Sequence, residues 1–145
     1  MRPRAASAVG LATLLGSSGA LHLARPQVLE PLIPRALGPA RAWVVGSGVA
    51  ELACAAALVL PRTRRLGGAA SAALLVGVFP GNVKMALDSR PGARAWARRP
   101  AVAWGRLPLQ VPLVAWALSV AREIPGPGPA RDGAPRRRRG APTCR

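Results

Sequence analysis

A single carboxylate, Glu51, lies near the centre of an apolar run and is the residue with the most evident chemical potential. The run extends from Trp43 to Leu60, about the length that a membrane-spanning helix requires, and Pro61 and three arginines follow it. A carboxylate at this depth costs roughly 2.5 kcal/mol or more unless it faces other helices or water. Glu51 is therefore either part of a polar site or a polar contact that fixes helix packing.

Other polar side chains are expected at a depth similar to that of Glu51. His22 ends the first apolar run, Asn82 and Lys84 lie in the last third of the third, and Gln110 lies in the first third of the fourth. Because all fall between the bilayer middle and the side carrying the two long connectors, we expect one pocket or one hydrogen-bond network. The predicted polar pocket consists of His22, Ser47, Glu51, Asn82, Lys84, Arg106 and Gln110, with no catalytic residue assigned.

Two interpretations of Glu51 stay open. In the first, it is a buried acid that binds a proton, a cation or a quinone-like head group. In the second, which we favour slightly, it hydrogen-bonds His22, Asn82 or Gln110 and holds helices together. The choice depends on which side chains the helices bring next to it.

No metal site is expected. His22 is the only histidine and has no second soft ligand at helical spacing, so an interfacial partner role is favoured over a metal ligand or proton relay. Cys54 and Cys144 form no CxxC pair, and Cys54 suits a small packing position.

Four apolar runs must position these side chains. Similar runs follow the first, which favours a retained helix over a signal peptide at the N-terminus. Proline-rich basic connectors follow the first and third runs, and a tight basic turn at 61–65 follows the second. The predicted spans are residues 5–23, 43–60, 67–87 and 103–121.

Prolines and small residues predict local features within these spans. Pro80 predicts a kink or break in the third run, with Asn82 satisfying the freed backbone, and Pro112 predicts a bend in the fourth. Gly46 and Ala50 repeat the small-xxx-small spacing of close helix contacts. Ser47, Gly48 and Glu51 lie on one face of this span, because positions three and four apart are neighbours on a helix, and that face should look at another helix.

Composition indicates the fold class. Half of the 145 residues are apolar, yet the chain has one Phe and no Tyr, so its apolar content is mostly Ala, Leu and Val. Such residues suit helices packed closely in lipid better than a water-soluble core. We predict an all-α fold, a four-helix transmembrane bundle over residues 1–122, with a disordered basic C-terminal tail over 123–145.

The net charge of +16 does not indicate nucleic-acid binding. Basic residues fall almost entirely between the apolar runs and in the tail, where membrane proteins place them, so the expected partner is the lipid bilayer. Somewhat more of them lie on the side of the termini than in the two long connectors. We therefore predict a multi-pass cell-membrane protein with both termini cytoplasmic.

Several motifs in order resemble the DoxX family of small membrane proteins. They are GALHLARP, LIP, SGVAEL, PRTRR, VFPGNVKMAL and RLPLQVPLVAWAL, which together cover roughly residues 10–122. The resemblance implies a four-helix membrane protein with polar positions at His22, Glu51, Asn82, Arg106 and Gln110. The chain departs from the pattern at Leu23, where Phe is common, and at Lys84, where an uncharged residue is expected. Lys84 either neutralises Glu51, extends to the interface, or pairs with Asp88 four residues on.

Three functions follow from these observations and this resemblance. The family's links to thiosulfate:quinone oxidoreduction and membrane oxidoreductase complexes favour a non-catalytic membrane subunit or partner of a redox complex, or a homo-oligomer. The alternative is a quinone-linked oxidoreductase component whose pocket surrounds Glu51, with quinone as a cofactor by family analogy only. A small transporter is the least favoured, because four spans without a repeat are few.

Overall fold

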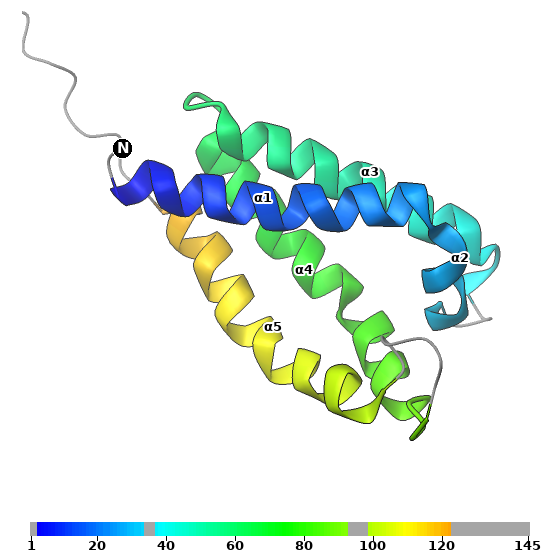
Figure 1. The fold of residues 1–145 in the computed structure, drawn as a ribbon. Helices are drawn as coiled ribbons and strands as arrows, with labels where there is room; N and C mark the ends of the chain where they lie inside the picture. The colour runs from blue at the N-terminus through cyan, green and yellow to red at the C-terminus, as the bar shows by residue number, and fades with distance from the viewer. Residues whose placement is uncertain (1–2, 34–36, 93–98, 123–145) are drawn as a thin grey trace, which may run out of the picture.

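The computed structural model describes residues 3–33, 37–92 and 99–122, and every regular element in these ranges is helical. The predicted all-α fold is confirmed (Figure 1). Residues 123–145, predicted to be a disordered tail, lie outside the described residues. The elements are α1 (Pro3–Ala24), α2 (Pro26–Leu29), η1 (Glu30–Leu32), α3 (Ala40–Val59), α4 (Arg64–Leu87) and α5 (Pro100–Ala121).

Helices α1, α3, α4 and α5 are long and apolar enough to cross a membrane, as the four predicted spans require. Each begins two or three residues before its predicted start, because prolines and polar residues are compatible with a first helical turn, and each ends within one residue of its predicted end. Helix α5 begins at Pro100, which gives the fourth span its full length. The short α2 and η1 occupy the first connector, predicted to hold short helical or extended pieces.

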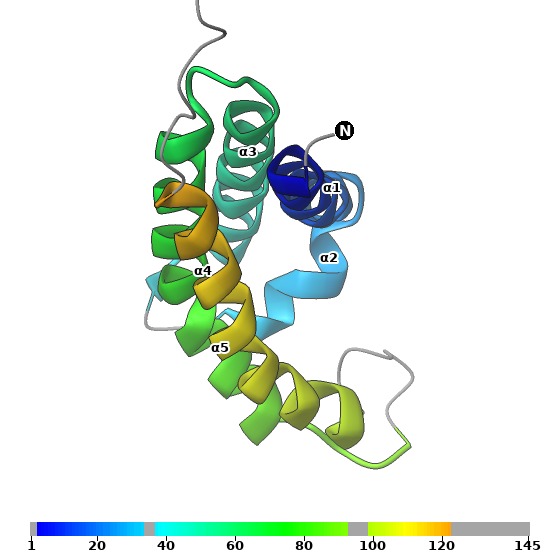
Figure 2. The ribbon, with the colours of Figure 1, turned by 90° about the vertical axis from the view of Figure 1, so that its left-hand side faces the viewer.

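The four long helices form two antiparallel pairs. Helix α1 packs mainly on α3 and α5 mainly on α4, while α3 and α4 join the pairs and α1 meets α5 over a small area. Figures 1 and 2 show α5 diverging from α1 toward one end of the bundle. We call this the connector end, where α1 ends at Ala24 and α4 at Leu87; at the opposite, terminus end, α3 ends at Val59 and α4 begins at Arg64.

The apolar core is divided between these ends. The larger cluster contains Leu11, Leu15, Leu58 and Val120, all buried, and joins the helices toward the terminus end. The smaller cluster is made of Met85, Ala86 and Ala103, with Leu32 of η1 and Leu107 packed against it. The first connector therefore contributes a side chain to the contact between α4 and α5.

The break considered at Pro80 does not occur. Helix α4 continues from Arg64 to Leu87 with Pro80 inside it, and α5 likewise contains Pro108 and Pro112. A proline removes one backbone hydrogen bond, but the turns on both sides keep theirs, so the helix continues through it. Pro108 lies inside α5 and not in its first turn, because the helix begins eight residues earlier, at Pro100.

Glycines set the closest helix contacts. A Cβ built on Gly68 of α4 would lie 2.6 Å from the backbone N of Ala121, at the end of α5. A Cβ on Gly48 of α3 would lie 2.7 Å from Cβ of His22 in α1. Nothing lies within 4 Å of a Cβ on Gly46, so the close contact predicted there is wrong. Gly48, predicted to share the helix-facing side of this span with Glu51, does meet α1.

The basic turn after α3 holds helix ends together. Thr63 Oγ1 donates to the carbonyl of Ala57 (2.9 Å), and Arg64 Nε donates to the carbonyl of Leu58 (3.1 Å). Arg65 Nε donates to the carbonyl of Ala121 (3.2 Å), which links the start of α4 to the end of α5. These side chains satisfy carbonyls that lack a partner within their own helix.

Gly68→Ala should destabilise the bundle by about 1–3 kcal/mol, because the added methyl overlaps the backbone of α5. The matched control is Gly77→Ala in the same helix, where nothing lies within 4 Å of the new Cβ and helix propensity favours alanine. Thermal unfolding of both variants in detergent micelles measures the difference. Equal melting temperatures would contradict the close contact at Gly68.

Candidate functional site

His22 and Glu51 meet between α1 and α3. The distance from His22 Nδ1 to Glu51 Oε2 is 3.0 Å, and the Glu51 side chain is only 8% exposed. His22 lies two residues before the end of α1, and Glu51 lies near the middle of α3. Of the three partners considered for Glu51, the structure selects His22.

Two glycines one turn before these side chains allow the contact. Gly19 precedes His22 by three residues and Gly48 precedes Glu51 by three, so each lies on the same helix face as its polar neighbour. A Cβ on Gly19 would lie 2.7 Å from the Gly48 carbonyl oxygen. The helix backbones therefore approach closely at this level, which brings the imidazole within reach of the carboxylate.

The direction of this hydrogen bond depends on the tautomer of His22. With an ionised Glu51, which can only accept, Nδ1 is the donor, and Nε2 is then the acceptor in a neutral imidazole or a second donor in a protonated one. Nε2 makes no hydrogen bond in the described part of the chain, and the His22 side chain is 19% exposed. The pair could therefore bind a hydroxyl or carbonyl group, or take up a proton, at one accessible atom.

A second polar pair joins α4 and α5. Asn82 Nδ2 donates to Gln110 Oε1 at 3.2 Å, and Gln110 Nε2 donates to the carbonyl of Leu75. Gln110 is buried, so this arrangement satisfies a polar side chain that would otherwise be unpaired in the bundle. Asn82, expected to satisfy backbone freed by Pro80, bonds the side chain of the neighbouring helix instead.

The other predicted pocket residues lie apart from these pairs. Lys84 pairs with Asp88 one turn on, as its spacing allowed, and not with Glu51. Ser47 donates to the carbonyl of Val44 in its own helix (3.0 Å), and Arg106 is half-buried without a hydrogen bond in the described ranges. The seven predicted residues are thus brought together only as two separate pairs.

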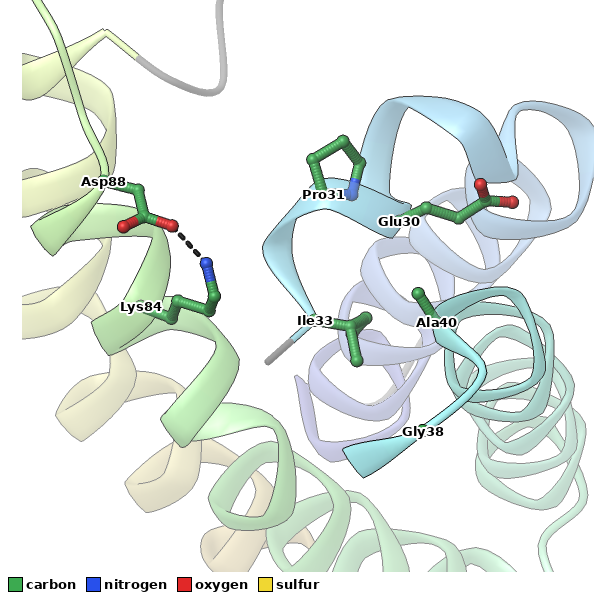
Figure 3. A pocket seen from close by; sticks show the side chains of 7 residues that line it. All are labelled: Glu30, Pro31, Ile33, Gly38, Ala40, Lys84 and Asp88. Carbon is green, nitrogen blue, oxygen red and sulfur yellow. Dashed lines mark hydrogen bonds and ion pairs between the residues drawn. The ribbon is translucent and has the colours of Figure 1, made fainter. Parts of the chain in front are cut away.

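Lys84 and Asp88 instead line a hollow at the connector end. Figure 3 shows them on one wall, with Ile33 and Ala40 on the wall opposite. The hollow has a volume of about 510 Å³, and Glu30 also lines it, with one carboxylate oxygen, Oε1, buried without a hydrogen-bond partner. Sequence analysis missed this space, because η1 and the start of α3 come together only in the folded bundle.

Two further observations concern redox and metal chemistry. Cys54 is a free, buried cysteine that packs in the larger apolar cluster. In the described ranges, no three His, Cys, Asp or Glu side chains are grouped to hold a metal ion. Among the predicted pocket residues, the side-chain contacts in the described ranges are therefore His22–Glu51, Asn82–Gln110 and Lys84–Asp88.

Comparison with known proteins gives one match. Residues 11–121 match the model of a family described as a domain of unknown function, DUF8561. The matched range includes both polar pairs and the helix contacts of Gly19, Gly48, Gly68, Arg64 and Arg65. No curated protein and no solved structure matches the chain.

A double-mutant cycle at His22 and Glu51 should give a coupling free energy of about 0.5–2 kcal/mol, the range found for hydrogen bonds between membrane helices. The variants are His22→Ala, Glu51→Gln and the double variant. Unfolding free energies measured in bicelles provide the cycle. Additive single effects would show that the 3.0 Å contact contributes nothing to stability.

Glu51→Gln and Asn82→Leu should be additive within about 0.5 kcal/mol, because the structure places the two residues in separate pairs. The same unfolding measurement on the two single variants and their combination checks this. A coupling above 1 kcal/mol would restore the single network that the sequence predicted.

Proposed function

We propose that this chain, which belongs to the DUF8561 family, is a non-catalytic membrane subunit that supports a redox complex in the bilayer. The observation that carries the proposal is that its central polar side chains form hydrogen bonds between helices. Glu51 and Gln110, the buried members, are each bonded to a neighbouring helix. Polar groups used in this way specify which helices pack together.

The identity of the partner comes from the sequence. The order of the motifs GALHLARP, SGVAEL, VFPGNVKMAL and RLPLQ supports a relation to the DoxX family, and through it a membrane oxidoreductase as partner. Helix α5 is the part of the bundle most available to such a partner, because it is the least buried of the four long helices. Its outward side chains Trp104, Leu109 and Val111 are all more than half exposed.

A second candidate function rests on the accessible Nε2 of His22. An imidazole whose other nitrogen bonds a carboxylate is arranged to exchange a proton with a bound hydroxyl or carbonyl group. A quinone offers such carbonyls within the membrane. This supports the alternative of a quinone-linked component, with quinone as its cofactor.

We also propose the cell membrane as the location, with both termini cytoplasmic. The support is the charge at the terminus end, where the turn between α3 and α4 and the end of α5 carry four arginines. Cytoplasmic loops of membrane proteins carry an excess of such residues. At the connector end, the carboxylates of Glu30 and Asp88 offset part of the positive charge of the arginines there.

The test is purification of the wild type and Glu51→Gln in mild detergent, with identification of co-purifying proteins and extracted quinones by mass spectrometry. A non-catalytic subunit should retain the same oxidoreductase partner in both forms and carry no stoichiometric quinone. Trp104→Ala together with Val111→Ala should weaken retention of that partner, with Val76→Ala, an exposed position on α4, as the matched control.

Quinone bound by the wild type and lost in Glu51→Gln would replace this proposal with the quinone-linked alternative. Recovery of a second copy of the chain as the sole partner would replace it with a homo-oligomer. Loss of quinone in Glu51→Gln would assign binding to the polar pair, and loss of the second copy in the α5 variants would assign association to α5.

A further inference from the structure

The terminus end of the bundle gathers several positively charged side chains. Arg62, Arg64 and Arg65 lie in and just after the turn that follows α3, and Arg122 follows α5. None of the described residues at this end is Asp or Glu, whereas the connector end holds Glu30 and Asp88. Figures 1 and 2 both place the α3–α4 turn and the end of α5 at the same end of the molecule.

The four arginines divide into two groups. Two side-chain nitrogens of Arg64 donate hydrogen bonds to the carbonyls of Leu58 and Val59, so this arginine holds the end of α3. Arg65 uses only Nε, on Ala121, which leaves both terminal nitrogens available. Arg62 and Arg122 are exposed and have no ion pair or hydrogen bond through their side chains in the described part of the chain.

Two contacts bring the available groups together. Gly68 packs against the backbone of Ala121, and Arg65 bonds the carbonyl of the same residue. Arg122 is the next residue, so the guanidinium groups of Arg65 and Arg122 extend from touching helix ends. Exposed leucines flank them: Leu60 is 57% and Leu66 is 70% exposed.

We propose that this basic end, formed by Arg62, Arg65 and Arg122, binds the phosphate groups of anionic phospholipids. Guanidinium groups bind phosphate through paired N–H donors, and phosphate is the abundant anion at the level where a membrane helix ends. Leu60 and Leu66 lie where acyl chains begin, which suits a lipid better than a soluble anion. Clusters of arginine beside a membrane helix attract anionic lipids in this way.

The test compares retention of phosphatidylglycerol and phosphatidylcholine by native mass spectrometry after purification from mixed nanodiscs. Wild type should retain phosphatidylglycerol preferentially. Arg62→Gln with Arg122→Gln should lower this preference about fivefold for each arginine removed. Both substitutions leave the hydrogen bonds of Arg64 and Arg65 in place, so the fold is preserved.

The matched control is Arg41→Gln with Arg90→Gln, two exposed arginines at the connector end, which should keep the wild-type preference. A second measurement is the rise in melting temperature on adding phosphatidylglycerol, expected in the wild type and control and reduced in the terminus-end variant. Equal loss of lipid in both variants would overturn the location of the site. Equal stabilisation by glycerol phosphate would overturn the lipid as ligand. Neither outcome bears on the redox partner, which is proposed from other residues.

Discussion

The cost of placing a carboxylate at membrane depth is the constraint on which this structure depends. Glu51 lies near the middle of α3, where lipid offers it no hydrogen-bond donor. His22 is the donor that the fold supplies, and it reaches Glu51 because Gly19 and Gly48 allow the two backbones to approach. One buried acid thus fixes the register and the facing sides of α1 and α3.

The same principle recurs in the second pair of helices. Gln110 of α5 is buried against α4, where it finds Asn82 and the carbonyl of Leu75. The pairs are joined by the larger apolar cluster and by two hydrogen bonds. Arg64 at the start of α4 donates to the carbonyl of Leu58 in α3, and Trp116 Nε1 of α5 donates to Ser7 Oγ of α1. Because apolar side chains gain nothing by leaving lipid for protein, close packing and polar contacts carry the specificity.

Sequence alone predicts the helices because span length follows from bilayer thickness and each apolar run is interrupted by prolines or arginines. It predicts partners poorly, because periodicity shows which residues share a face but not which helix that face meets. Gly46 and Gly48 illustrate the limit: both fit a small-residue contact, and only Gly48 makes one. Lys84 is another case, since Asp88 at local spacing was a closer partner than the distant Glu51.

The prediction of one polar pocket relied on the depth of each residue in the membrane. Two residues at the same depth are in contact only if their helices are also neighbours and the residues face each other. His22, Glu51, Asn82 and Gln110 do fall in the predicted part of their helices, but α1 and α5 diverge toward the connector end (Figure 2). Leu32 of η1 packs on the α4–α5 side, where it adds to the apolar cluster of Met85 and Ala103. Each polar pair therefore closes within its own pair of helices. Of the two members of the first pair, His22 is the more exposed, so it covers the buried acid on the side of α1.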